Sequence, residues 1–395
     1  MPEKTLPLYR LEFKSFQDWN GARLSQTLTF HNNGSSWWIK VAVDWSLPEQ
    51  VLGLGYFKRR FVFQEFVEAL DFGQLQLLDD TMTTINLSLT EQSQNSITIR
   101  NGHQNPANLL IAVAHRMCYT IAEDPKRVIY PILERQRQRC LPIFEARYLQ
   151  TVEVVAPTVS TVLFKQQIFA CKTIDRPIYE PEDTEHILNE IDVLEQLRGV
   201  PSIAQLVGLV VSENPYKTCP STDSPAVITG FLLEYYPGGS LEQVFEDEFQ
   251  FDALPIQWAL QIGTALRSLH KRGRTHLDIK PSNIVLDANE NAVLIDVSGT
   301  GGYVWEWLSP EMQILIEQNS ETSPANAPFE ARVSTDCWAY GRLLSAIAEK
   351  SGTSGIGKKL QFIADGLTKA APESRILLCD ALAQLNENES SSTGS

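Results

Sequence analysis

The chain has 395 residues, of which 43% are hydrophobic and 21% charged, and its formal net charge is −15 at pH 7. This length is generous for one domain and comfortable for two, and the apolar fraction can fill sizeable cores. So negative a chain argues against a protein whose main task is to neutralise nucleic-acid phosphates. The six cysteines contain no C-x-x-C pair, which excludes a disulfide framework and the common zinc-ligand spacings.

Charge divides the chain into two parts. Residues 1–145 carry 15 basic and 15 acidic side chains, whereas residues 146–395 carry 18 and 33. This contrast predicts a domain boundary near residue 145. The N-terminus lacks the apolar run of a signal peptide, and no stretch approaches the ~18 apolar residues of a membrane span. We therefore expect an intracellular protein, cytoplasmic or nuclear or both, with no membrane and no nucleic acid among its partners.

Residues 1–145 mix strand and helix patterns and predict an α+β domain of unknown function. Hydrophobic residues alternate from Trp37 to Trp45 and from Ile85 to Leu89, as they do in half-buried strands. Asn105-Pro106 is typical of a helix start, since proline suits the first turn. The apolar face of this predicted helix consists of Leu109, Leu110, Val113, Met117 and Ile121.

Two strings in this region resemble fragments of phosphate- and metal-binding motifs. They are Gly53-Leu-Gly55 and Asp71-Phe72-Gly73. The short spacing between them leaves no room for the elements that such motifs need. We assign no chemistry to either string.

The strongest motif is His276-Leu-Asp278-Ile-Lys280-Pro-Ser-Asn283, which is followed by Asp296-Val-Ser-Gly299. This order resembles the catalytic loop and the metal-binding triplet of the eukaryotic protein kinase superfamily. The resemblance extends over residues 147–387. It implies an α+β chain with a bilobal kinase-like fold, in which a small β-rich lobe precedes a larger, mainly helical lobe. The polar residues 388–395 are predicted to be a disordered tail.

The resemblance assigns roles to the polar residues of the motif. Asp278 is expected to accept a hydrogen bond from the attacking hydroxyl, and Lys280 to contact the transferred phosphate. Asn283 and Asp296 are expected to hold Mg²⁺, which prefers oxygen ligands. Phosphoryl transfer depends on charge neutralisation and alignment more than on covalent chemistry. The implied cofactors are ATP and Mg²⁺, and the implied partner is a protein substrate that offers a Ser or Thr hydroxyl.

A lysine and a glutamate upstream complete the catalytic set. Ala170 and Lys172 lie two apart in a strand pattern, so they share one face, which the resemblance turns toward the nucleotide. Glu190 follows in a helix pattern whose apolar face includes Ile187 and Ile191. We predict an ion pair between Lys172 and Glu190.

The segment Leu233-Glu234-Tyr235-Tyr236 resembles the hinge that holds adenine. Leu233 is expected to be the gatekeeper, and the backbone at Glu234 and Tyr236 is expected to pair with the base. The other expected nucleotide-binding residues are Val155, Val162, Ala170, Lys172 and Val285. Further on, the resemblance implies that Asp336 braces the catalytic loop and that Glu311 pairs with Arg375.

The sequence also departs from the family pattern. The three glycine positions of the nucleotide-covering loop are Val155, Pro157 and Ser160, and Pro157 removes a backbone donor. Leu277 replaces an arginine that binds an activation-loop phosphate in many kinases, and the segment from Asp296 to Glu311 is short.

These departures motivate a second hypothesis beside a Ser/Thr protein kinase. It is a pseudokinase that serves as a nucleotide-binding scaffold or a regulatory interaction module. Under either hypothesis, residues 1–145 are a candidate site for a regulatory protein. A small-molecule phosphotransferase is the third class, which Lys280-Pro281 and Ser309-Pro310-Glu311 make the least favoured.

Overall fold

The computed structural model describes residues 9–19, 23–43, 45, 47–89, 95–100, 102, 105, 107–136, 140–175, 179–220, 225–246, 254–299, 302–319 and 323–387. The chain forms two compact units. Unit 1 comprises Met1–Gln138, Ile178–Pro181 and Ser212–Val227, and unit 2 comprises Arg139–Pro177, Glu182–Val211 and Ile228–Ser395. The main division thus falls between Gln138 and Arg139, a few residues before the boundary that charge predicts. The predicted tail, residues 388–395, lies outside the described residues.

Unit 1 is built on a five-stranded sheet with helices. Its strands lie in the order β1-β2-β3-β4-β5, and among the described pairs of this sheet only β3–β4 is parallel. The chain crosses between β3 and β4 through α1 and α2, and Phe63, Phe66 and Val67 of α2 enter the core. The elements are β1 (Tyr9–Asp18), β2 (Leu24–Asn32), β3 (Ser35–Val43), α1 (Glu49–Leu52), α2 (Tyr56–Ala69), β4 (Met82–Ser88), α3 (Leu109–Ala112) and β5 (Cys118–Glu123).

The two alternating patterns are confirmed as β3 and β4, but the helix predicted from Asn105 through Ile121 is wrong. Only α3 is helical there, and a 3-10 turn (Ala114–Arg116) leads into β5. Ile121 pairs with Ile85 of β4 and therefore lies in the sheet, although its spacing from the preceding apolar residues is helical. Asn108 caps the short helix, because its side-chain oxygen accepts hydrogen bonds from the backbone amides of Leu110 and Ile111.

Two later segments of the chain complete unit 1. In the segment Ser212–Val227, Tyr216 packs its ring edge-on against Trp38, with centroids 5.6 Å apart. Its hydroxyl accepts a 2.9 Å hydrogen bond from the backbone amide of Val128. Thr218 and Asp80 exchange two hydrogen bonds of 2.8 Å between backbone amides and side chains. Residues 1–138 are therefore not the whole of this unit.

The small lobe of unit 2 is a six-stranded sheet with one helix. The strand order is β6-β10-β11-β9-β8-β7, in which β6 runs parallel to β10. The elements are β6 (Ile143–Glu145), β7 (Gln150–Ala156), β8 (Val159–Phe164), β9 (Gln167–Thr173), α4 (Glu182–Gln196), β10 (Leu206–Ser212) and β11 (Val227–Glu234). The helix predicted around Glu190 is confirmed as α4, and the segment that leads into the predicted hinge forms β11.

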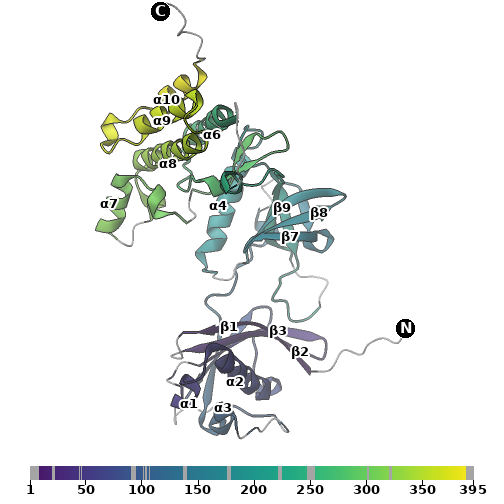
Figure 1. The fold of residues 1–395 in the computed structure, drawn as a ribbon. Coiled ribbons are helices and arrows are strands. Elements are labelled where there is room, and N and C mark those ends of the chain that lie inside the picture. The colour runs from purple at the N-terminus through teal and green to yellow at the C-terminus, as the bar shows by residue number, and fades with distance from the viewer. Residues whose placement is uncertain are drawn as a thin grey trace, which may run out of the picture. The chain divides into compact units, whose positions relative to one another are not determined.

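The large lobe of unit 2 is mainly helical, and Figure 1 shows α6, α8, α9 and α10 packed together. Trp258 of α6 and Tyr340 of α8 are fully buried, and the Tyr340 hydroxyl donates to the carbonyl of Ala259 over 2.7 Å. The described α+β content confirms the predicted bilobal fold. The elements are α5 (Leu241–Glu246), α6 (Leu254–His270), β12 (Ile284–Leu286), β13 (Ala292–Leu294), α7 (Pro310–Gln318), α8 (Phe329–Lys350), α9 (Gly355–Leu367) and α10 (Leu378–Asn386).

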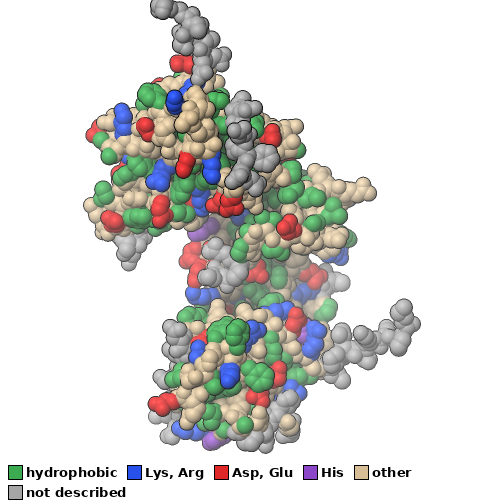
Figure 2. All heavy atoms as spheres, in the orientation of Figure 1, with side chains coloured by type: hydrophobic (Ala, Val, Ile, Leu, Met, Phe, Trp, Pro, Cys, Tyr) green, Lys and Arg blue, Asp and Glu red, His purple; other side chains and the backbone are tan. Residues whose placement is uncertain are grey.

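The surface carries mixed chemistry. On the face drawn in Figure 2, Asp and Glu side chains are scattered over unit 2 among apolar and uncharged ones. Such dispersal is typical of a solvated acidic surface. No helix in the described part of the chain is both long and apolar enough to cross a membrane.

Candidate active site

Lys172 and Glu190 form an ion pair inside the small lobe. Lys172 points from β9 and Glu190 from α4, where Glu190 is only 3% exposed. The Lys172 Nζ lies 2.7 Å from Oε2 and 3.0 Å from Oε1 of Glu190. Helix α4 turns Glu190 inward because Ile187, about one turn before it, and Leu194, about one turn after it, are buried on the same face.

Asp296 is the third member of this cluster. It follows β13, and its Oδ1 lies 2.7 Å from the Lys172 Nζ. Its backbone φ is +57°, in the left-handed region that residues other than glycine seldom adopt. Strain of this kind persists where the surrounding structure holds it, and it is common at functional sites.

The charges of the cluster support one another. Burial disfavours the charged form of Lys172, but the carboxylates of Glu190 and Asp296 outweigh burial and raise the pKa of Lys172. Burial also disfavours ionised Asp296, but the Lys172 ammonium outweighs it and lowers the pKa of Asp296. At neutral pH the site therefore presents a fixed ammonium beside an ionised carboxylate.

The catalytic-loop residues converge on Asp278. Its Oδ2 accepts 2.7 Å hydrogen bonds from the Lys280 Nζ and the Asn283 Nδ2. Its Oδ1 is buried and has no hydrogen-bond partner among the described residues. A buried acceptor without a donor costs about 1–3 kcal/mol, so this oxygen suits a donor that arrives with a substrate.

Asp336 braces the loop from beneath. This fully buried carboxylate of α8 accepts hydrogen bonds from the backbone amides of His276 at 2.9 Å and Leu277 at 2.7 Å. Its Oδ2 also lies 2.9 Å from the His270 Nε2. Leu277 has a φ of +66°, so the brace holds the loop where its backbone is strained. The Arg375 guanidinium likewise binds both carboxylate oxygens of Glu311, at 2.7 and 2.8 Å.

Asn283 and Asp296 have the chemistry of a Mg²⁺ site. Both N–H groups of the Asn283 amide are used, since Nδ2 donates to the carbonyl and to the Oδ2 of Asp278 over 2.7 Å each. The amide oxygen of Asn283 therefore faces away from Asp278 and is available to coordinate a cation. The Asp296 carboxylate supplies the negative charge that a hard cation needs. These residues fit Mg²⁺ with nucleotide phosphates and water as its other ligands.

Most of the predicted nucleotide-binding residues lie on neighbouring strands. Thr161 of β8 pairs with Ala170, and Leu233 of β11 pairs with Ala170 from the other side. Val162 is buried beside Thr161. Val285 lies in the large lobe on β12, where it bridges to Ser240 just after the hinge.

The remaining nucleotide-binding predictions lie farther out. Val155 lies near the end of β7 and is 62% exposed. β7 and β8 meet at Pro157-Thr158 as an ordinary hairpin turn, without any glycine. The Glu234 and Tyr236 side chains point into a cavity whose lining includes no residue of β8 or β9. Their backbone is thus the only part of these two residues that remains for the predicted contact with adenine.

Asn189 is a residue of this site that the sequence did not reveal. Its Nδ2 donates to the carbonyl of Ser298 over 2.8 Å, so α4 holds the segment that follows Asp296. Gly299 supports the same arrangement, since a Cβ there would meet the carbonyl of Thr275 at 2.4 Å. The position of Asn189 directly before Glu190 on the inward helix is the only signal that points to it.

Comparison with known protein families and relatives agrees with this geometry. Residues 158–300 match the family model of the protein kinase domain. A probable cAMP-dependent protein kinase catalytic subunit of Encephalitozoon cuniculi is 30% identical over 159 residues, which are 36% of this chain and 44% of that protein. A serine/threonine-protein kinase-like protein of Arabidopsis thaliana is 28% identical over 201 residues, 49% of this chain and 52% of that protein.

A third relative extends the same pattern. The 3-phosphoinositide-dependent protein kinase B of Dictyostelium discoideum is 28% identical over 198 residues, which are 45% of this chain and 19% of that protein. The chain therefore spans about half the length of the first two relatives and about a fifth of the third.

Proposed function

The chain belongs to the protein kinase superfamily, and from this premise we propose that it transfers the γ-phosphoryl group of ATP to Ser or Thr hydroxyls of a protein. The observation that carries the proposal is the convergence of Lys172, Glu190 and Asp296 at one end of the site. Asp278, Lys280 and Asn283 form a second hydrogen-bonded set on the loop that Asp336 braces.

Each side chain has one task in this proposal. Lys172 neutralises phosphate charge, and Glu190 keeps its ammonium in place. The Asp278 Oδ1 accepts the proton of the attacking hydroxyl as the new O–P bond forms and the bond to the ADP oxygen breaks. Lys280, beside Asp278, faces the transferred group. Mg²⁺, held by Asn283 and Asp296, would neutralise the phosphate oxygens during transfer.

The Ser/Thr class rests on Lys280, which lies two residues after Asp278 as in the family's Ser/Thr members, and on the printed names of the relatives. The pseudokinase alternative is not favoured, since the described site retains the polar side chains that transfer needs. The missing glycines predict a weaker hold on the phosphates rather than none. A regulatory partner of unit 1 and an intracellular location remain predictions.

The proposal is tested with purified full-length chain, Mg²⁺ and γ-³²P-labelled ATP, with a mixture of basic and acidic Ser/Thr proteins as acceptors. We expect label on phosphoserine or phosphothreonine, and a loss of about 10²–10⁴-fold in Asp278→Asn. Glu349→Gln, an exposed carboxylate on α8, serves as the control and should retain activity. Label that stays the same in Asp278→Asn would refute the proposed role of this residue, and no transfer in the wild type would favour the pseudokinase.

A further inference from the structure

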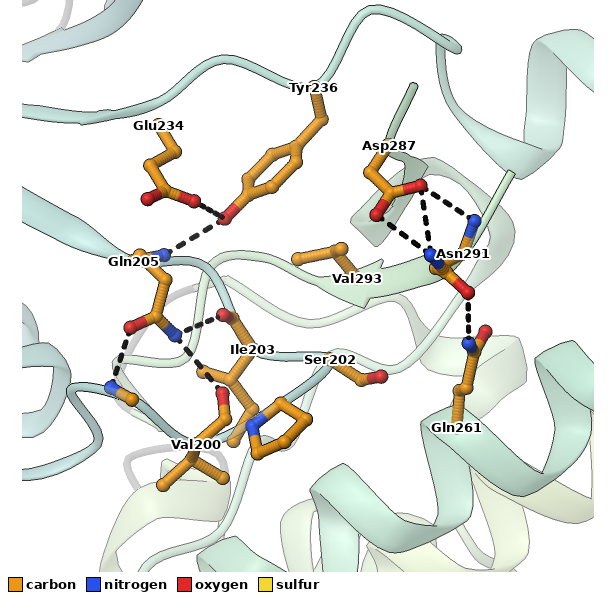
Figure 3. Close-up of a pocket in the computed structure, with 12 residues that line it drawn as sticks. Val200, Ser202, Ile203, Gln205, Glu234, Tyr236, Gln261, Asp287, Asn291 and Val293 are labelled. Carbon is orange, nitrogen blue, oxygen red and sulfur yellow. Dashed lines mark hydrogen bonds between the residues drawn. The ribbon is translucent and has the colours of Figure 1, made fainter. Parts of the chain in front are cut away.

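A cavity of about 530 Å³ lies outside the cluster of Lys172 and Asp278. Its walls come from the loop between α4 and β10, from the hinge, from α6 and from the β12–β13 turn (Figure 3). None of the proposed phosphate- or metal-binding residues lines it. Cavities of 300–1,000 Å³ are of the size that binds ligands.

The polar amides of the cavity are already used to build its walls. The Gln205 Nε2 donates to the carbonyls of Val200 and Ile203, and its Oε1 accepts from the Gly199 amide. The Gln261 Nε2 donates to Asn291 over 2.7 Å. These amide groups therefore fix the shape of the cavity, and other side chains must bind its ligand.

Two carboxylates on opposite sides of the cavity carry its charge. Among the described residues, the Glu234 carboxylate has one long contact, 3.5 Å to the Tyr236 hydroxyl, and the side chain lines the cavity (Figure 3). Burial raises the pKa of Asp287, but hydrogen bonds from the Asn291 side chain and from two backbone amides outweigh burial and lower it. The Asp287 carboxylate is therefore ionised. Among the described residues, no lysine or arginine lines the cavity.

Part of the lining is apolar and comes from Val200, Pro201, Ile203 and Val293. In Figure 3, Val293 lies between the two carboxylates and Ile203 lies nearer to Gln205. An occupant therefore needs an apolar stem and a cationic head. Arginine combines both, since its alkyl chain packs on apolar surface and its guanidinium can form bidentate hydrogen bonds with a carboxylate.

We propose that this cavity, behind the hinge, is a docking site for an arginine-bearing segment of a partner protein. The arginine stem lies on Ile203 and Val293, and the carboxylates of Glu234 and Asp287 both attract the guanidinium. The proposal goes beyond the proposed phosphoryl transfer and does not depend on it.

The test uses the full chain with ¹³C-labelled Ile and Val methyl groups and no nucleotide. The probe is the peptide acetyl-Ala-Leu-Arg-Leu-Ala-amide, and its citrulline version is the matched neutral control. We expect the arginine peptide to shift the Ile203 and Val293 methyl signals saturably, and the citrulline peptide to bind at least about 10-fold more weakly, as expected for a lost charged hydrogen bond.

Two variants locate the recognition. Glu234→Gln and Asp287→Asn keep the size of each side chain and should each weaken binding by about 5-fold or more, whereas Glu349→Gln should not change it. Methyl spectra that are unchanged away from the cavity verify that the variants fold. If Asp287→Asn does not fold, Glu234→Gln alone tests the proposal. Equal binding of the two peptides, shifts confined to other methyl groups, or no saturable shift at millimolar peptide would each overturn the proposal.

Discussion

The Lys172 Nζ lies 2.7 Å from Oε2 of Glu190, a residue eighteen positions later on a different element. Glu190 is almost completely buried, so the pair is sealed from water on the carboxylate side. Breaking a buried pair on one side is costlier than replacing both partners, because it leaves an uncompensated charge. This asymmetry gives a stability test that is independent of catalysis.

Lys172→Met should lower the free energy of unfolding by about 3 kcal/mol at pH 7. Adding Glu190→Gln to Lys172→Met should restore part of that loss, since the orphaned carboxylate is gone. Urea denaturation of the two single variants and the double variant measures the coupling. Costs that simply add would show that the two charges do not interact.

Restoring the glycines of the nucleotide-covering loop should tighten ATP binding. The triple substitution Val155→Gly, Pro157→Gly and Ser160→Gly returns one backbone donor and removes Cβ atoms near the phosphates. One regained hydrogen bond corresponds to roughly 2- to 12-fold in Kd. Isothermal titration with Mg-ATP measures it.

Val152→Gly serves as the control for the loop variant, because it introduces a glycine at an exposed position earlier on β7. An affinity gain of equal size in this control would assign the effect to strand flexibility and not to the loop.

Acid should weaken the large lobe through Glu311. Burial raises the pKa of this carboxyl, but the bidentate bond from Arg375 and a hydrogen bond from Ser334 lower it to about 2. Because the folded pKa lies below the unfolded value, the stabilisation is complete above about pH 4.5 and is lost as the pH falls toward 2. Glu311→Gln should therefore destabilise the chain by about 2–3 kcal/mol at pH 7 and by much less at pH 3, as followed by denaturant unfolding. A constant cost across this range would contradict the ion pair.

Unit 1 should depend on Tyr216, which comes from the segment Ser212–Val227. Tyr216→Ala removes a buried ring and should cost about 3 kcal/mol, whereas Tyr216→Phe keeps the ring, loses the acceptor for the Val128 amide and should cost about 1 kcal/mol. Hydrogen exchange of the amides in β2 and β3 reports the loss locally. Protection that is unchanged in Tyr216→Ala would mean that residues 1–138 fold without this segment.

The sequence predicted what short motifs and regular periods encode. The helical face around Glu190 and the two-residue spacing of Ala170 and Lys172 were enough to predict the ion pair. The motif order was enough to predict that Asp336 braces the loop and that Glu311 meets Arg375. All of these contacts are present.

Features that depend on residues distant in the chain could not be predicted from the sequence. Ile121 fits a helical face as well as a strand, and its pairing with Ile85 of β4 places it in β5. Asn189 binds a backbone carbonyl, which leaves no mark in the sequence of its partner. Ser212–Val227 belongs to unit 1 through its tertiary contacts. The local hydrophobic pattern of a sequence does not reveal such contacts.

The central claim, that these side chains gather around the terminal phosphate of Mg-ATP, is tested most directly by titrating ATP calorimetrically with and without Mg²⁺. In the wild type we expect Mg²⁺ to strengthen ATP binding, and in Asp296→Asn we expect that gain to disappear while metal-free binding persists. A gain from Mg²⁺ that is equally large in Asp296→Asn, or no ATP binding by the wild type at all, would contradict the account.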